Sequence, residues 1–164
     1  MKNMVPQALF FTKGKGSADN ELEAFEHALR DAGIEKFNLV RVSSIIPPNC
    51  RIISPEEGLH KLEPGKIVFL VLSRIDSKEE GKLISASVGA AIPEKDYGYL
   101  SEYEAVGESQ SISSAKAKKL AVSMLNTSRS AGAIVGHITT RSVSVSCRVR
   151  KGKWSCAVAA AVLI

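Results

Sequence analysis

Short apolar segments separated by polar and glycine-rich breaks run along the whole chain. Several of these segments are rich in β-branched residues or alternate apolar with polar positions, which is the pattern of a β-strand. Alternation is clearest in residues 138–148, and a turn at Lys151 and Gly152 then predicts a hairpin with the final strand. Strands are expected at residues 7–12, 37–45, 66–75, 83–92, 98–106, 138–148 and 154–164.

Two other segments have apolar residues spaced three and four positions apart, which is the spacing of one helix face. Asp19 or Asn20 can cap the first helix, which runs to about Ala32 and stops at Gly33. Its apolar stripe consists of Leu22, Phe25, Leu29 and Ala32. The second helix is expected at residues 113–130, with an apolar face formed by Ala117, Leu120, Ala121, Met124 and Leu125.

The order of these elements is strand, helix, four strands, helix and hairpin. It lacks the regular βαβ alternation of a doubly wound nucleotide fold. The loop expected at residues 13–17 contains glycines but not the spacing of a phosphate-binding loop. We therefore expect an α+β fold, a layered αββα-type sandwich of largely antiparallel sheet with two main helices. A single domain should cover residues 1–164, since neither a linker nor a repeat interrupts the chain.

Composition narrows the class of protein. With 45% hydrophobic and 24% charged residues, the chain is typical of a folded globular domain. Its net charge of +5 comes from scattered lysines and arginines, and only 5% of the residues are aromatic. A nucleic-acid surface would need a basic stripe with stacking aromatic rings, so we expect no nucleic-acid partner. A basic RNA-binding domain stays as an alternative.

The cysteines and the two ends of the chain argue against a disulfide-bonded, a metal-binding, a secreted or a membrane-spanning protein. Cys50, Cys147 and Cys156 are an odd number with no close pair, so we expect neither a disulfide framework nor a metal site. The N-terminus lacks the apolar core of a signal peptide. The apolar stretch of residues 156–164 is far shorter than the roughly 20 residues that span a bilayer. The prediction is a cytoplasmic protein without a membrane partner.

The most unusual segment is the strand that runs into Ser43 and Ser44 and is then stopped by Pro47 and Pro48. Proline cannot donate a hydrogen bond to a strand ladder, and it restricts the residue before it. Adjacent serines are common, and the plain interpretation of this pair is a polar strand end. Because the sequence shows no cofactor loop or metal cluster, the pair is also a candidate for chemistry made from the backbone itself.

The residues around the two serines resemble the pyruvoyl-dependent arginine decarboxylase family. The similarity runs in the same order through nearly the whole chain, and its most specific parts are the serine junction and the run Glu102-Tyr103-Glu104. The resemblance implies a lyase that removes carbon dioxide from arginine to give agmatine, an early step of polyamine synthesis. The matching stretches are residues 24–26, 31–34, 37–48, 85–93, 102–104 and 156–161.

The resemblance implies a covalent pyruvoyl cofactor made by self-cleavage between Ser43 and Ser44. The Ser44 hydroxyl attacks the Ser43 carbonyl carbon and forms an ester. Loss of the Ser44 α-proton then breaks the chain, and hydrolysis releases ammonia. The mature protein would consist of a β chain, residues 1–43, and an α chain, residues 44–164, which starts with the pyruvoyl group. That ketone would form a Schiff base with the substrate amine and act as an electron sink.

The resemblance also assigns roles around this group. Glu102 would be the catalytic acid that protonates the former α-carbon, in a closed apolar site. Glu26 would bind the substrate guanidinium as a paired carboxylate, although the family is expected to have aspartate there. Ser43, Leu22 and Phe37 would also contact the small-molecule amino-acid substrate. The plain interpretation of Glu26 is a surface ion pair with Arg30, four positions further along the helix.

Asn38 matches a position that the family uses in catalysis. It lies six residues before Ser44, or about 20 Å along a strand at roughly 3.3 Å per residue. One site can therefore combine the two residues without a sharp bend only if they come from different subunits. This agrees with the homotrimer and interfacial sites that the resemblance implies, and a dimer of trimers stays open.

Two further alternatives fit the sequence. Because Glu26 has one methylene more than aspartate, the chain could be a related pyruvoyl decarboxylase that acts on another amino acid. Outside the enzymes, it could be a processing-defective paralogue without catalytic activity that binds an active partner.

Overall fold

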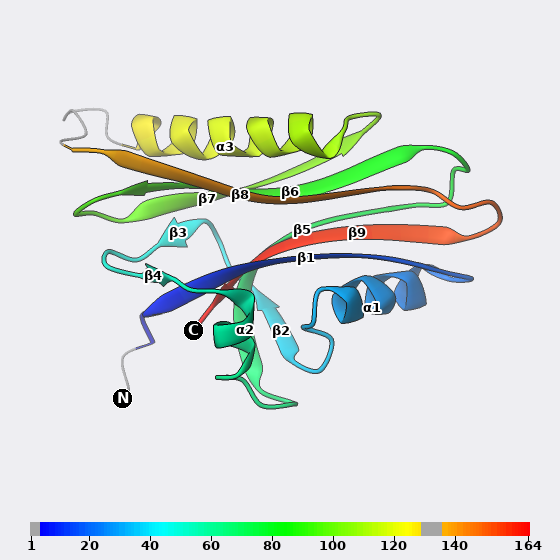
Figure 1. Ribbon diagram of the computed structural model, residues 1–164, viewed down its shortest axis with the longest axis horizontal. Coiled ribbons are helices and arrows are strands. Elements are labelled where there is room, and N and C mark those ends of the chain that lie inside the picture. Colours follow the sequence, from blue (N-terminus) through cyan, green and yellow to red (C-terminus); the bar gives the residue numbers. More distant parts are fainter. Residues whose placement is uncertain (1–3, 129–135) are drawn as a thin grey trace.

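The helices and strands form four layers in the computed structural model, which describes residues 4–128 and 136–164 (Figure 1). Helix α3 (Gln110–Thr127) covers the outer face of one β-sheet, and helix α1 (Glu21–Asp31) lies on the outer face of the other. The two sheets stack on each other between these helices. The predicted α+β sandwich with two main helices is confirmed. The short helix α2 (Pro55–Leu59) has no counterpart in the prediction.

A five-stranded sheet has the strand order β2-β5-β9-β1-β4, and a four-stranded sheet has the order β3-β7-β6-β8. Neighbouring strands are antiparallel except in the pairs β1–β4 and β2–β5, which are parallel. The five-stranded sheet contains β1 (Ala8–Ala18), β2 (Asn38–Arg41), β4 (Arg51–Ile52), β5 (Ile67–Ser77) and β9 (Trp154–Leu163). The four-stranded sheet contains β3 (Ile45–Ile46), β6 (Leu83–Pro93), β7 (Gly98–Val106) and β8 (Ile138–Arg148).

Strand β9 is buried on both faces because it lies at the centre of the five-stranded sheet, between β5 and β1. Its even-numbered residues, such as Cys156 and Val158, belong to the apolar cluster beneath α1. Its odd-numbered residues, such as Ala157 and Ala159, pack between the two sheets. A strand with two buried faces has a continuous apolar run instead of alternation, as this sequence does.

The hairpin predicted from β8 and β9 is wrong. Strand β8 pairs with β6 in the four-stranded sheet, whereas β9 pairs with β1 and β5 in the other sheet. The turn at Lys151 and Gly152 therefore carries the chain from one layer to the other (Figure 1). The difference has a physical reason: β8 alternates and forms a sheet edge, while β9 has no polar face and must lie at a centre.

Strand β1 continues to Ala18 through residues 13–17, so the flexible loop predicted there is also wrong. Gly14 and Gly16 face α1, and a Cβ on Gly14 would lie only 2.1 Å from the Ala28 carbonyl oxygen. These glycines are needed because the helix backbone lies directly on the strand, not because the chain must be flexible there.

Replacing Gly14 with alanine is expected to lower the free energy of unfolding by about 1–3 kcal/mol, because the added methyl group forces α1 away from β1. Urea denaturation at one fixed protein concentration measures the change. Lys13→Ala is the matched control, since Lys13 is exposed on the same strand and should change this free energy by less than about 0.5 kcal/mol. Equal stability of the Gly14→Ala and unsubstituted proteins would contradict the close helix–strand contact.

Helix α1 begins and ends where the sequence predicts, but its buried face differs. The Asn20 side chain caps the first turn by accepting a backbone N–H hydrogen bond of 2.9 Å, and Gly33 follows the last turn with a φ of +75°. The buried residues are Ala24 and Ala28, whereas Leu22 is 74% exposed. The predicted apolar stripe is therefore wrong for Leu22, because the side that lies closest to β1 accommodates only small side chains.

Helix α3 starts at Gln110, earlier than expected, because Ser109 caps it. The buried face includes Ala117, Ala121 and Leu125 as predicted, and Leu120 is exposed. The predicted end of this helix, at residue 130, lies outside the described residues. Among the helices that the structure describes, none combines the length and the apolar character needed to cross a membrane.

Candidate active site

The chain crosses from the five-stranded to the four-stranded sheet at residues 42–44. Strand β2 ends at Arg41 in the first sheet, and β3 then pairs with β7 in the second. At the crossing the Ser44 carbonyl accepts a hydrogen bond of 2.6 Å from the Leu100 N–H of β7. The single strand predicted at residues 37–45 is wrong, because its two ends belong to different sheets.

Ser43 and Ser44 lie within this crossing. Ser43 is exposed and Ser44 is half-buried. In the part of the chain that the structure describes, neither hydroxyl has a hydrogen-bond partner. Ser43 also lines a mostly apolar hollow of about 370 Å³ together with Val42, Ile45 and Phe69. The Ser44 carbonyl is thus fixed while its hydroxyl remains available, which suits a residue that must act as a nucleophile.

Glu102 lies at the same sheet edge as Ser44, on β7 two positions beyond Leu100. Its Oε1 accepts a hydrogen bond of 3.2 Å from Arg41 Nη2, and the same nitrogen donates to the Leu72 carbonyl at 2.7 Å. The Glu102 side chain is 34% exposed. In one chain this carboxyl group is therefore paired with the Arg41 cation.

Arg41 is the residue of this site that sequence reasoning missed. It is the one charged residue among residues 37–46, and it lies three positions before Ser44. An arginine in such a strand needs polar partners if it is even partly buried. Its isolation among apolar neighbours was the signal that could have identified it.

Asn38 lies at the other end of β2 from the crossing. It is exposed, and its Nδ2 donates to the Gly65 carbonyl at 2.7 Å. Strand β2 runs without a break from Asn38 to Arg41, so no bend returns Asn38 to Ser44. A single chain does not bring these two residues together.

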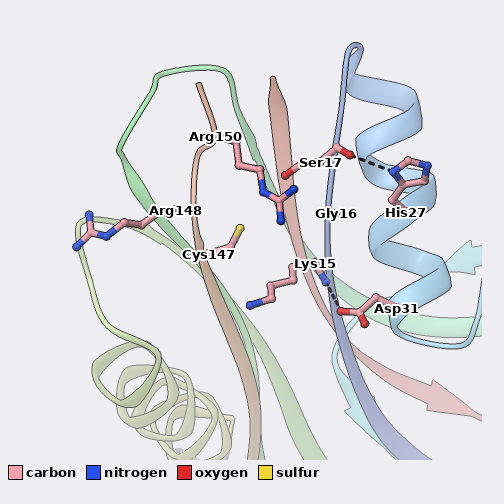
Figure 2. Close-up of a pocket in the computed structure, with 8 residues that line it drawn as sticks. All are labelled: Lys15, Gly16, Ser17, His27, Asp31, Cys147, Arg148 and Arg150. Carbon is pink, nitrogen blue, oxygen red and sulfur yellow. Dashed lines mark hydrogen bonds between the residues drawn. The ribbon is translucent and has the colours of Figure 1, made fainter. Parts of the chain in front are cut away.

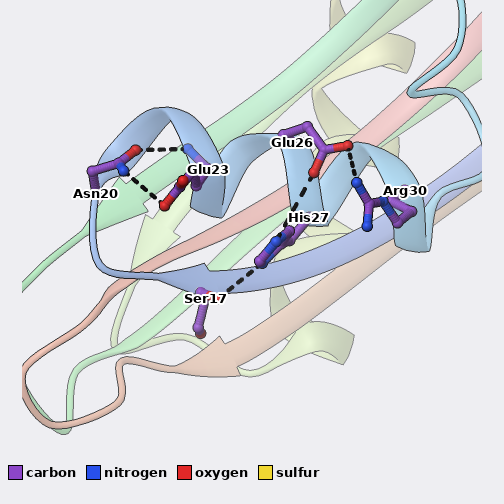
Figure 3. Close-up of polar contacts among 6 residues, drawn as sticks. All are labelled: Ser17, Asn20, Glu23, Glu26, His27 and Arg30. Atoms are coloured by element: carbon purple, nitrogen blue, oxygen red, sulfur yellow. Dashed lines mark hydrogen bonds and ion pairs between the residues drawn. The ribbon is translucent and has the colours of Figure 1, made fainter.

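Glu26 and Leu22 lie on α1, on the outer face of the five-stranded sheet rather than at the crossing (Figure 1). Glu26 Oε1 accepts a hydrogen bond of 2.6 Å from Arg30 Nη2, and its Oε2 lies 4.0 Å from His27 Nε2 (Figure 3). The ion pair that the sequence allows is therefore present. Phe37 is buried in the apolar cluster beneath α1. The predicted substrate-binding residues are thus divided between the two faces of this sheet.

A cavity of about 430 Å³ lies on the opposite side of the sandwich, between β1, α1 and the end of β8 (Figure 2). Lys15, Asp31, Cys147 and Arg150 are among the residues that line it. Burial raises the pKa of the Cys147 thiol, and the nearby charges of Lys15 and Arg150 partly oppose this effect. The cavity contains none of the predicted site residues. No group of three His, Cys, Asp or Glu side chains in the described ranges is arranged to hold a metal ion.

The resemblance implied self-cleavage between Ser43 and Ser44 and a catalytic Glu102. In the structure the chain crosses between its two sheets at these serines, and Glu102 lies on the strand whose Leu100 bonds Ser44. The family model described as pyruvoyl-dependent arginine decarboxylase (PvlArgDC) matches residues 8–164. The chain belongs to the pyruvoyl-dependent arginine decarboxylase family, whose name states its dependence on a pyruvoyl group.

Similar proteins from several species carry the same description. Pyruvoyl-dependent arginine decarboxylase 1 of Methanosarcina acetivorans is 48% identical over 163 residues, which cover 98% of this chain and 97% of that protein. Pyruvoyl-dependent arginine decarboxylase 2 of Archaeoglobus fulgidus is 48% identical, with 98% of each chain covered. The enzyme of Methanocella arvoryzae is 46% identical over 99% of this chain and 98% of its own. The similarity therefore extends over nearly the whole length of these relatives.

Proposed function

We propose that this chain is an arginine decarboxylase that makes its pyruvoyl group from its own Ser44 and releases agmatine and carbon dioxide. The names of its relatives support arginine as the substrate. The observation that carries the proposal is the crossing between the sheets. There the Ser44 carbonyl is held by Leu100, its hydroxyl has no partner within the described residues, and Glu102 lies on the same strand as Leu100.

Self-cleavage would begin with attack of the Ser44 Oγ on the Ser43 carbonyl carbon, which breaks the peptide bond and leaves an ester. Removal of the Ser44 α-proton then expels the Ser43 carboxylate, and water replaces the nitrogen of residue 44 as ammonia. The exposure of Ser43 supports this step, because the new chain end can move into solvent. The hydrogen bond to the Ser44 carbonyl would keep residue 44 in place.

The position of the serines also explains how both products could stay folded. The fragment 1–43 contains β1, α1 and β2, which pair with or pack against β9 and β5 of the fragment 44–164. Strand β2, which precedes the cut, belongs to the five-stranded sheet, and β3, which follows it, belongs to the four-stranded sheet. Cleavage would therefore break no strand and release neither fragment.

The proposed chemistry then divides between the cofactor and the side chains around it. The pyruvoyl group would bind the substrate amine and withdraw electrons from the α-carbon as carbon dioxide leaves. Glu102 would donate a proton to that carbon. Arg41 is hydrogen-bonded to Glu102, and the Leu100 N–H donates to the Ser44 carbonyl, where negative charge would collect.

We further propose that the site is completed between copies of the chain, in a homotrimer with interfacial sites, with pairing of trimers left open. The separation of Glu26 and Leu22 from Ser44 by a sheet supports this, since one chain cannot use them together. Exposed apolar side chains at the edge that carries the crossing give further support, because such residues are common in interfaces. They are Val40 and Ile45.

Replacing Glu26 with glutamine should raise KM for arginine by about tenfold or more, because a charge-assisted pair with the guanidinium is lost. Because this contact is remote from the reacting carbon, kcat should change less. Glu23→Gln is the matched control on the same helix, where Glu23 accepts a hydrogen bond from Asn20 (Figure 3). A similar rise in KM in both variants, or in neither, would remove Glu26 from the substrate site.

Release of carbon dioxide from a panel of amino acids tests the function itself. Arginine should react fastest, with agmatine recovered in equal amount. Faster release from another amino acid would instead support the related decarboxylase that the extra methylene of Glu26 allows. An intact chain without activity toward any of them would indicate a processing-defective paralogue.

A further inference from the structure

Arg41 is fixed through one nitrogen and keeps the rest of its guanidinium free. Both of its contacts, to the Leu72 carbonyl and to Glu102, are made by Nη2. In the described ranges, Nε and Nη1 have no partner. The side chain is 59% exposed, so a ligand can reach these N–H groups. Arg41 therefore presents unused N–H donors at Nη1 and Nε, each of which can donate one charge-assisted hydrogen bond to a carboxylate.

Arg41 and its partner Glu102 both lie near the reacting residue, Ser44. Arg41 is three positions before Ser44, and its partner Glu102 is two positions beyond Leu100, which bonds Ser44. A substrate joined through its α-amine to residue 44 has its carboxylate only one carbon further away. Among the described residues that line the mostly apolar hollow beside Ser43, none has a charged side chain that could pair with this carboxylate.

We propose that Arg41 binds the α-carboxylate of the substrate through Nη1 while Nη2 holds Glu102. This inference rests on the proposed decarboxylase function. The bond between the α-carbon and the carboxylate breaks, its electron pair remains with the α-carbon, and carbon dioxide leaves Arg41. Glu102 Oε2 then gives its proton to that carbon, since Oε1 accepts from Arg41. One guanidinium would thus hold both the leaving group and the proton donor.

Agmatine provides a sharp test, because it is arginine without the carboxylate. The first arm uses Arg41→Gln in a Ser44→Ala chain, which cannot form the ketone, so calorimetry measures non-covalent binding alone. Arginine binding should weaken by about tenfold or more, as expected for loss of a charged pair. Agmatine binding should change by less than about twofold, since it makes no contact with Arg41 on this proposal.

The second arm uses the cleaved enzyme with Ser44 intact. Arg41→Gln should raise KM for arginine by about tenfold or more and leave the inhibition constant of agmatine within about twofold. Arg148→Gln is the matched control, because Arg148 is exposed and likewise donates to a backbone carbonyl, that of Gly81, at 3.1 Å. This control should change neither the KM for arginine nor the inhibition constant of agmatine.

Equal weakening of arginine and agmatine would overturn the proposal and leave Arg41 a structural role only. Unchanged binding of both ligands would also overturn it. These failures differ from failure of the proposed function, in which the unsubstituted enzyme releases no carbon dioxide from arginine. If it does release carbon dioxide and Arg41→Gln leaves KM unchanged, only the role of Arg41 is wrong.

Discussion

Replacing Ser44 with alanine is expected to leave the chain intact at 17.6 kDa and without measurable decarboxylase activity. The unsubstituted protein should instead give two fragments, residues 1–43 and 44–164, the larger with a blocked N-terminus. Alanine lacks the oxygen that attacks the preceding carbonyl, and no other residue can supply the ketone. Intact-mass measurement of the purified proteins distinguishes the two results.

Ser43→Ala is the matched control, because the neighbouring serine contributes only its carbonyl carbon to the bond that breaks. Its side chain is exposed and has no hydrogen-bond partner in the described part of the chain, so cleavage should continue after residue 43. Cleavage that persists in Ser44→Ala but stops in Ser43→Ala would show that Ser43, and not Ser44, is the nucleophile. An unsubstituted chain that stays whole would instead indicate a processing-defective paralogue.

The layers of the fold could be predicted because local signals determine them. Asn20 caps α1 and Gly33 ends it, and alternation marks the strands at sheet edges. The sheet to which each strand belongs could not be predicted, since β8 and β9 are joined by a tight turn that normally forms a hairpin. Strand β9 does not pair with β8 because it is buried on both faces at the centre of the other sheet. That burial depends on the packing of the whole sandwich and not on the turn.

The candidate site could be predicted only in part. The resemblance named Ser44 and Glu102 but not their arrangement; they share one sheet edge because Leu100 bonds the first and precedes the second on β7. Arg41 could not be assigned, since its contact with Glu102 exists only because the chain changes sheets after β2. Asn38 cannot be placed in the site from one chain, because β2 does not bend back toward the crossing.

Replacing Glu102 with glutamine is expected to lower kcat by about 10²- to 10⁴-fold, the usual contribution of a positioned general acid. Glutamine keeps the size of the side chain and can still accept a hydrogen bond from Arg41, but it has no carboxyl proton to give. Carbon dioxide release under saturating arginine measures the loss. Cleavage after residue 43 should still occur, which intact mass would confirm, so the effect can be assigned to the decarboxylation itself.

Glu104→Gln is the control that tests whether the loss of kcat in Glu102→Gln comes from the missing proton donor or only from the removal of a negative charge at this sheet edge. Glu104 is two positions further along β7, and its Oε1 accepts a hydrogen bond of 2.7 Å from Ser73. Glutamine preserves that acceptor, so kcat should fall by less than about threefold, within the range of a surface substitution. A cleaved Glu102→Gln enzyme with unchanged kcat would exclude Glu102 as the acid, because the α-carbon would then receive its proton from another group.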